Sequence, residues 1–152
     1  MMLSKNLSLA EATKSATAIK HGIANDPTPE HLQNLKDLAE NVFQPIREHF
    51  ATPLAVSSGY RSAALNQRIG GSKSSQHMQG KAVDLDAHIF GGVTNNEIFN
   101  FIKDNLDFDQ LIWEFGTEDE PDWVHVSYNG SENRKQILRA VRNDGRTQYL
   151  YY

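Results

Sequence analysis

The chain has 152 residues, the length of one ordinary domain, and no cysteine, which excludes disulfides, thiolate nucleophiles and cysteine-ligated zinc. Its formal net charge of −4 provides no overall positive field for nucleic acid. With 39% hydrophobic residues it can bury a core, but no apolar run approaches the roughly 20 residues of a membrane span. We therefore expect one domain over residues 1–152 that is monomeric, binds no nucleic acid and does not insert into a membrane. The N-terminal residues show no signal-peptide pattern, which predicts synthesis in the cytoplasm.

The first half of the chain is predicted to be helical. Ser8 and Glu11 form a capping-box pattern ahead of a short apolar series. Thr28 and Pro29 open a longer helix, whose apolar residues follow at three-and-four spacing. Because Pro45 lies inside that pattern, we expect it to kink or interrupt the longer helix.

The second half is predicted to alternate between short strands and helices. We expect helices over residues 62–69 and after Thr94, and strands over residues 54–56, 81–86, 109–115 and 123–128. Residues 134–142 are ambiguous; the favoured interpretation is a strand that pairs back on 123–128 through the Asn129-Gly130 turn. These elements predict an α+β domain, with helices packed on one face of a small antiparallel sheet and the other face left for a site.

Three polar side chains in this half are candidate metal ligands. By strand alternation, Asp84 and His125 point away from the core side, and Gly80 permits a tight turn that brings His77 back toward them. Two imidazoles and a carboxylate are a sufficient zinc shell with one position left for water, and they leave the site formally +1. On spacing alone, Asp84 is equally well a solvated residue and His125 a half-buried structural histidine. Glu114, on the polar side of its strand, is expected to line the cleft or to orient a ligand histidine.

Three segments taken together decide between these interpretations: Ser57–Ser62, Ser75–Asp84 and Asp122–His125. They resemble the zinc peptidases that include D-Ala-D-Ala carboxypeptidases and phage L-Ala-D-Glu endopeptidases, within the wider LAS metallopeptidase group. The family pattern is S-x-H-x-x-G-x-A-x-D followed by a D/E-x-W-H-type segment. The resemblance implies a hedgehog/DD-peptidase-like fold and one Zn²⁺ per chain.

The resemblance also implies a role for individual residues. The zinc ligands would be His77, Asp84 and His125. Asp122 matches the general base, Arg61 matches the arginine that stabilises the substrate carbonyl or its oxyanion, and Ser75 resembles the serine that holds the substrate backbone.

The function that the resemblance implies is hydrolysis of amide bonds in the stem peptide of bacterial peptidoglycan. The favoured interpretation is a phage endolysin that cuts the L-Ala–D-Glu bond, made in the cytoplasm of an infected host and acting on the wall after release. The alternatives are a D-Ala-D-Ala carboxypeptidase, a virion-associated hydrolase, and a zinc-containing wall-binding module without catalytic activity. The presence of Asp122 and Arg61 argues against the last of these.

Overall fold

A six-stranded sheet organises the computed structural model, which describes residues 1–152. The strand order is β3-β4-β6-β5-β7-β8, and all neighbours are antiparallel except β5 and β7, which are parallel. These strands are β3 (Ala55–Ser58), β4 (Ala82–Asp86), β5 (Gln110–Glu114), β6 (Trp123–Ser127), β7 (Gln136–Asn143) and β8 (Arg146–Tyr151). A separate two-stranded sheet joins β1 (Met2–Ser4) to β2 (Leu7–Ser8) near the N-terminus.

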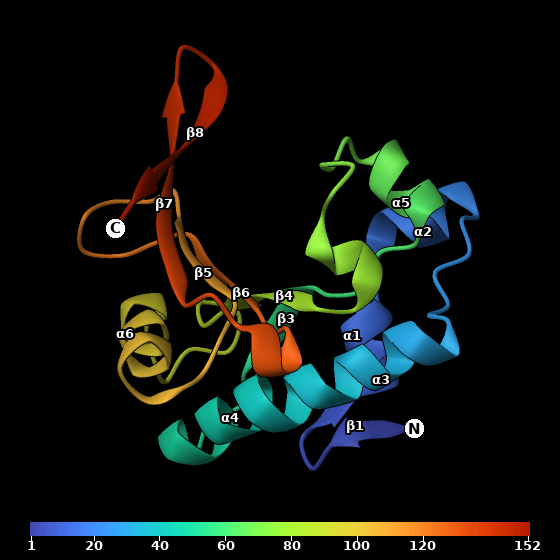
Figure 1. Ribbon diagram of the computed structural model, residues 1–152, viewed down its shortest axis with the longest axis horizontal. Helices are drawn as coiled ribbons and strands as arrows, with labels where there is room; N and C mark the ends of the chain where they lie inside the picture. The colour runs from blue at the N-terminus through green and yellow to red at the C-terminus, as the bar shows by residue number, and fades with distance from the viewer.

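The longer helices cover one side of the large sheet, so that in Figure 1 α3 and α4 run beneath it and α6 lies beside β5 and β6. The helices are α1 (Leu9–Thr13), α2 (Ala16–His21), α3 (Pro29–Leu38), α4 (Gln44–Phe50), α5 (Ala63–Arg68) and α6 (Asn95–Asn105). The shorter turns are the π-helical η1 (Ala39–Phe43) and the 3₁₀ helices η2 (Gln76–Gln79) and η3 (Gly130–Glu132). None of the helices combines the length and the apolar composition that a membrane span requires.

Strand alternation divides the sheet into a core face and a face that we call the site face. On the central strands Val83, Leu85, Val124 and Val126 belong to the hydrophobic core shared with the helices. Residues 84 and 125, which alternate with these, point to the opposite side, the site face. The expected α+β arrangement, with helices on one face and the other face left for a site, is confirmed.

Local capping signals formed as the sequence predicted. The side chains and backbones of Ser8 and Glu11 exchange the reciprocal hydrogen bonds of a capping box, and Thr94 and Glu97 do the same at the start of α6. The predicted interruption at Pro45 is also observed. The π-helical turn η1 separates α3 from α4 just before the proline, while the dihedrals of Leu38, Phe43 and Gln44 stay helical, so the hydrogen-bond pattern changes without ending the helix.

The pairing predicted for the C-terminal strand is wrong, although the strand itself is present as β7. It pairs in parallel with β5, from Gln110 opposite Gln136 to Glu114 opposite Ala140, and not with β6. The reason is that β4 and β5 already occupy both edges of β6, which leaves the outer edges of β3 and β5 free, and β7 takes the edge of β5. The chain crosses to that edge through η3 and then returns as β8, a strand that was not among the predicted elements.

Asp109, which is 1% exposed, connects the segment before β5 to two distant segments, one at Gln76 and one at Arg134. Its carboxylate accepts hydrogen bonds from Nε and Nη2 of Arg134 at 3.0 and 2.9 Å, from the backbone amide of Arg134 at 2.9 Å, and from Nε2 of Gln76 at 2.9 Å. Burial raises the pKa of Asp109, but these hydrogen bonds outweigh it and hold the pKa below its ordinary value. The carboxylate therefore fixes both the start of β7 and the segment that leads into His77.

We expect Asp109→Ala to lower the free energy of unfolding by about 1–3 kcal/mol, because the backbone amide of Arg134 and the side chain of Gln76 lose their acceptor, whereas the guanidinium of Arg134 is 56% exposed and stays hydrated. Urea denaturation at neutral pH measures this, with Asp104→Ala as the control, since the side chain of Asp104 is 65% exposed and its loss should cost less than about 0.5 kcal/mol. The stabilisation by ionised Asp109 is present above the pKa that this carboxyl has in the unfolded chain, and it is lost as the pH falls through its lower folded-state pKa. The difference in unfolding free energy between wild type and Asp109→Ala should therefore shrink in acid. Equal midpoints for wild type and Asp109→Ala at neutral pH would contradict this role.

Candidate metal centre

Asp84 and His125 meet across the pairing of β4 with β6. Their Cα atoms are direct partners in the antiparallel register, so both side chains leave the sheet on the site face. The Nδ1 atom of His125 lies 3.0 Å from Oδ1 of Asp84. The two side chains retain 12% and 14% of their exposure, which keeps the pair accessible from the surface.

His77 reaches the same point from η2. The Ser75 hydroxyl caps this short helix by accepting a hydrogen bond from the His77 amide, and Gly80 ends it with a φ of +71°. A Cβ atom on residue 80 would lie 2.4 Å from the carbonyl oxygen of His31, so only glycine fits this return toward β4. The His77 ring places Nδ1 2.8 Å from the carbonyl oxygen of Gly59 and Nε2 3.5 Å from Oδ1 of Asp84.

The electrostatics of the three residues favour the charge state that metal binding needs. Burial would raise the pKa of Asp84, but hydrogen bonds from His125 and His77 outweigh it and hold the pKa well below its usual value. Burial lowers the pKa of His77 despite the neighbouring carboxylate. The centre therefore presents an ionised acid and, at His77, a neutral imidazole near pH 7.

The donor set fits a zinc ion. One ligand atom from each of His77, Asp84 and His125 lies within 4.8 Å of the other two. In a tetrahedral site with bonds of roughly 2.0–2.2 Å, ligand atoms are about 3.3–3.5 Å apart, and the 3.0 and 3.5 Å separations observed here lie close to that range. The contact of His77 Nδ1 with a backbone carbonyl fixes the tautomer that leaves Nε2 free to bind metal.

Arg61 lies beside this centre. Its backbone amide donates to the carbonyl of His77 at 3.1 Å, and its Nη1 donates to Oδ1 of Asn66 at 3.1 Å. Burial lowers the pKa of Arg61, and the nearby charge of Asp84 partly restores it. Its Nε atom is buried without a hydrogen-bond partner, so the guanidinium retains an unused donor next to the metal-ligand group. The Arg61 side chain is partly exposed, and contact of its terminal guanidinium nitrogens with a substrate oxygen stays a prediction.

Ser75 has a structural task in this arrangement. Its hydroxyl accepts from the His77 amide at 3.3 Å, and its carbonyl accepts from Met78 at 3.2 Å. Both contacts fix the turn that carries the His77 ring. A contact with the substrate backbone stays a prediction for Ser75, whose side chain is partly exposed beside the centre.

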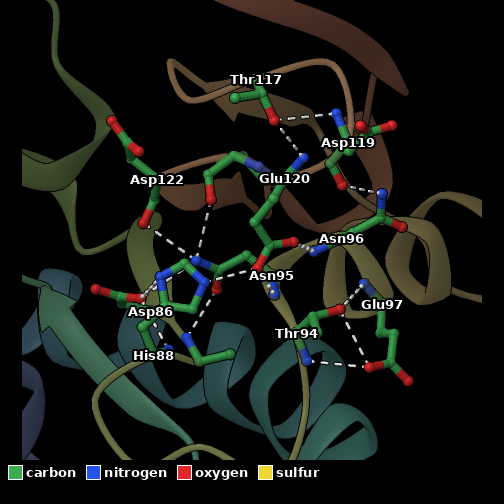
Figure 2. A network of polar contacts seen from close by, with 12 residues as sticks. Asp86, His88, Thr94, Asn95, Asn96, Glu97, Thr117, Asp119, Glu120 and Asp122 are labelled. Atoms are coloured by element: carbon green, nitrogen blue, oxygen red, sulfur yellow. Dashed lines mark hydrogen bonds and ion pairs between the residues drawn. The ribbon is translucent and has the colours of Figure 1, made fainter.

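The loop that leads into β6 is fastened to the start of α6 (Figure 2). The Glu120 carboxylate accepts from the backbone amides of Asn95 and Asn96 at 3.1 and 2.8 Å, where it interacts favourably with the helix N-terminus. Buried Asn95 donates to the carbonyl of Asp122 at 3.1 Å and to the carboxylate of Asp86 at 3.2 Å. These contacts fix the end of β4 and the beginning of β6, the two strands that carry Asp84 and His125.

Asp122 itself is exposed, and its carboxylate makes no hydrogen bond or ion pair with the three candidate ligands. In Figure 2 this carboxylate points away from the network around Asn95. Asp122 immediately precedes β6, so strand alternation does not set the direction of its side chain. It lines a hollow of about 460 Å³ together with Phe115, Gly116, Trp123, Val141 and Arg142. The general-base role of Asp122 stays a prediction.

Two further side chains belong to the site face. Glu114 at the end of β5 is buried there, as its strand phase indicated, and its charge interacts with those of His125 and Asp84. Tyr149 on β8 lies opposite Ala140, which in turn lies opposite Glu114, so it faces the same side of the sheet although it is 54% exposed. Partial desolvation and the charges of Glu114 and Asp84 raise the pKa of its phenol. Sequence reasoning missed Tyr149, although Asp144-Gly145 is a two-residue hairpin signal that could have predicted β8; both residues adopt the positive φ that this turn requires.

Comparison with known protein families matches residues 5–127 to the family described as Peptidase M15. The chain belongs to the M15 peptidase family. The match spans most of the chain and includes all three candidate ligands, whereas β7 and β8 lie beyond it. No curated protein matches the sequence closely enough to be named as a relative.

Family membership makes this M15 peptidase a metallopeptidase, and the family is zinc-dependent. Its substrates are accordingly expected to contain peptide bonds. The zinc ligands that the sequence predicted coincide with the group of His77, Asp84 and His125 that the structure brings together.

We expect His77→Ala and His125→Ala to lose bound zinc and activity together, because each removes one of only three protein ligands. The purified wild-type protein should hold about one zinc per chain, measured by elemental analysis. Its affinity should fall in acid, where protons compete for the imidazoles; because burial lowers the pKa of His77, that residue should resist protonation to lower pH than an exposed histidine.

The control for these variants is His49→Ala. His49 stacks on Phe101 with ring centroids 4.2 Å apart, away from the ligand group, and its removal should leave the zinc content unchanged. Full activity in a His77→Ala protein verified to be metal-free would exclude this centre.

Proposed function

We propose that this M15 peptidase hydrolyses amide bonds in the stem peptide of bacterial peptidoglycan, as an endolysin that cuts between L-Ala and D-Glu. The observation that carries the proposal is the grouping of His77, Asp84 and His125 on the open face of the sheet, with the charged side chain of Arg61 beside it. Metal-assisted amide hydrolysis uses a set of metal ligands together with a nearby positive charge that stabilises the developing oxyanion.

Bound zinc would supply Lewis acidity, polarising the scissile carbonyl and lowering the pKa of water toward about 7. Asp84 and the two histidines would hold the zinc ion. The contact of His77 with the Gly59 carbonyl keeps the His77 ring in the orientation that metal binding requires. Arg61 offers fixed positive charge where the carbonyl oxygen becomes negative in the tetrahedral intermediate. A proton must pass from the attacking water to the leaving nitrogen, and a nearby carboxylate is suited to carry it.

The choice of substrate depends on the sequence resemblance and is supported by the surroundings of the site. The stem peptide carries free carboxylates. Two cations lie on this side of the sheet that could attract them: Arg61 beside the ligand group and Arg142 in the hollow next to β6. The ligand group lies on a sheet face that no long helix covers, which suits access by an internal segment of a polymer.

The decisive experiment is mass spectrometry of muropeptides after digestion of purified peptidoglycan with the zinc-loaded protein. New L-Ala and D-Glu ends would support the endopeptidase. Loss of terminal D-Ala alone would make the protein a D,D-carboxypeptidase, and binding to the wall without any product would make it a non-catalytic module. Detection of the chain in purified virions would favour a virion-associated role over a lysis enzyme.

Arg61→Ala should lower kcat by about 10²–10³, because one donor aimed at developing negative charge typically contributes roughly 3–4 kcal/mol. KM should change less than kcat, since the interaction strengthens in the transition state. Arg61→Lys should recover only part of the rate, because it restores the charge without the planar guanidinium. Steady-state kinetics on a released muropeptide measures all three values.

Melting curves separate this role from a structural one. If Arg61 only supports the fold, both variants should melt at lower temperature and lose activity in proportion to unfolded protein. Arg68→Ala is the matched control, since Arg68 is an exposed arginine at the end of α5. Normal turnover by folded Arg61→Ala protein would remove Arg61 from the mechanism.

A further inference from the structure

Glu114 occupies the site face one step along the sheet from the metal-ligand group. Ile112 on β5 lies opposite His125, and Glu114 follows two positions later, so its side chain leaves the sheet on the same side as His125. Glu114 and His125 are therefore diagonal neighbours on adjacent strands. The Cα atoms of such neighbours are about 7–8 Å apart, a distance that a glutamate side chain and one water molecule can bridge. On the next two strands of the sheet, Ala140 of β7 lies opposite Glu114, and Tyr149 of β8 lies opposite Ala140.

Glu114 is nearly buried, and its carboxylate oxygens, which keep some contact with solvent, have no protein partner. The residue is 7% exposed, yet its side chain takes part in no hydrogen bond or ion pair. A buried carboxylate that serves the fold is normally paired, as Asp109 is with Arg134, because an unpaired one costs several kcal/mol. The fold thus maintains an unpaired acid beside the ligand group, and stability does not account for it.

The electrostatic surroundings suit proton exchange near neutral pH. Burial raises the pKa of Glu114 to about 7, the charge of His125 acts to lower it, and that of Asp84 acts to raise it further. The other titratable groups on this side are the phenol of Tyr149 and, in the hollow next to β6, the guanidinium of Arg142 and the carboxylate of Asp122. A group with a pKa close to the working pH can both accept a proton and give it back.

We propose that Glu114 is the catalytic residue that transfers the proton during amide hydrolysis, the role that the sequence resemblance assigns to Asp122. Its carboxylate accepts a proton from water as the water oxygen bonds to the carbonyl carbon. It then donates that proton to the amide nitrogen as the carbon–nitrogen bond breaks, which leaves a free amine and a carboxylic acid. This inference rests on the proposed peptidase function.

Burial and strand phase favour Glu114 over Asp122. Glu114 lies on the same face of the sheet as His125, through Ile112, and is 7% exposed, whereas Asp122 precedes β6 and is exposed. A proton-transfer group that is shielded from solvent is also less strongly screened from the reacting atoms.

The test compares three variants of the full, zinc-loaded chain on the same muropeptide. Glu114→Gln should keep its zinc and its melting temperature while kcat falls by about 10²–10⁴ with little change in KM. Asp122→Asn should lose less. Glu118→Gln, an exposed acid in the loop before β6, should keep wild-type activity. Full kcat in Glu114→Gln, or a large loss confined to Asp122→Asn, would overturn the proposal.

A second measurement needs no substrate. The carboxyl ¹³C signal of Glu114, assigned by its absence in Glu114→Gln, is titrated in the zinc-free and the zinc-loaded protein. A cation at the ligand group should lower the pKa of this carboxyl by about 1–3 pH units. An unchanged titration on zinc loading would place Glu114 outside the site and reject the proposal. Failure of the wild type to cut any muropeptide would count against the proposed function, and the titration would still decide whether Glu114 faces the metal.

Discussion

The antiparallel register of β4 with β6 is the constraint on which the site depends. It places Asp84 directly opposite His125 on the site face, while the residues between them face the helices. A shift of one residue in either strand would turn one ligand into the hydrophobic core. The core side chains of these two strands therefore fix the register, and the register in turn fixes the ligands. The contacts of Asn95 with Asp86 and with the carbonyl of Asp122 hold the ends of the same two strands.

The buried acids of the protein fall into two kinds. Asp109 and Asp84 are compensated by hydrogen bonds that lower their pKa, the first from Arg134 and Gln76 and the second from two histidines. Glu114 has no such partner, and burial raises its pKa. Paired acids keep their charge and fix neighbouring segments in place, whereas an unpaired acid can change its charge near neutral pH. Asp109 and Asp84 therefore have a structural or ligand role, whereas Glu114 is the acid near the ligand group that can exchange a proton.

The C-terminal hairpin adds to the part of the chain that matches the M15 family. The family match ends at residue 127, before β7 and β8, yet β7 pairs along the whole length of β5. This parallel pairing covers the edge of the strand that carries Glu114 and brings Tyr149 into the same row of the sheet. The tip of the hairpin projects beyond the rest of the sheet in Figure 1. The surroundings of the site on this side are therefore formed by residues outside the matched region.

The sequence by itself determined the α+β class, the capped helices, the interruption before Pro45 and the residues of the ligand group. Caps and strand alternation depend on neighbours a few positions away, and the ligand pattern is a local series of residue types. Only the tertiary structure decided that β7 pairs with β5, that Asp122 is exposed and that Glu114 is nearly buried without a hydrogen-bond partner. These outcomes depend on which sheet edge remains free and on which distant segments cover a side chain. No local pattern encodes either, because both are set by contacts between residues far apart in the chain.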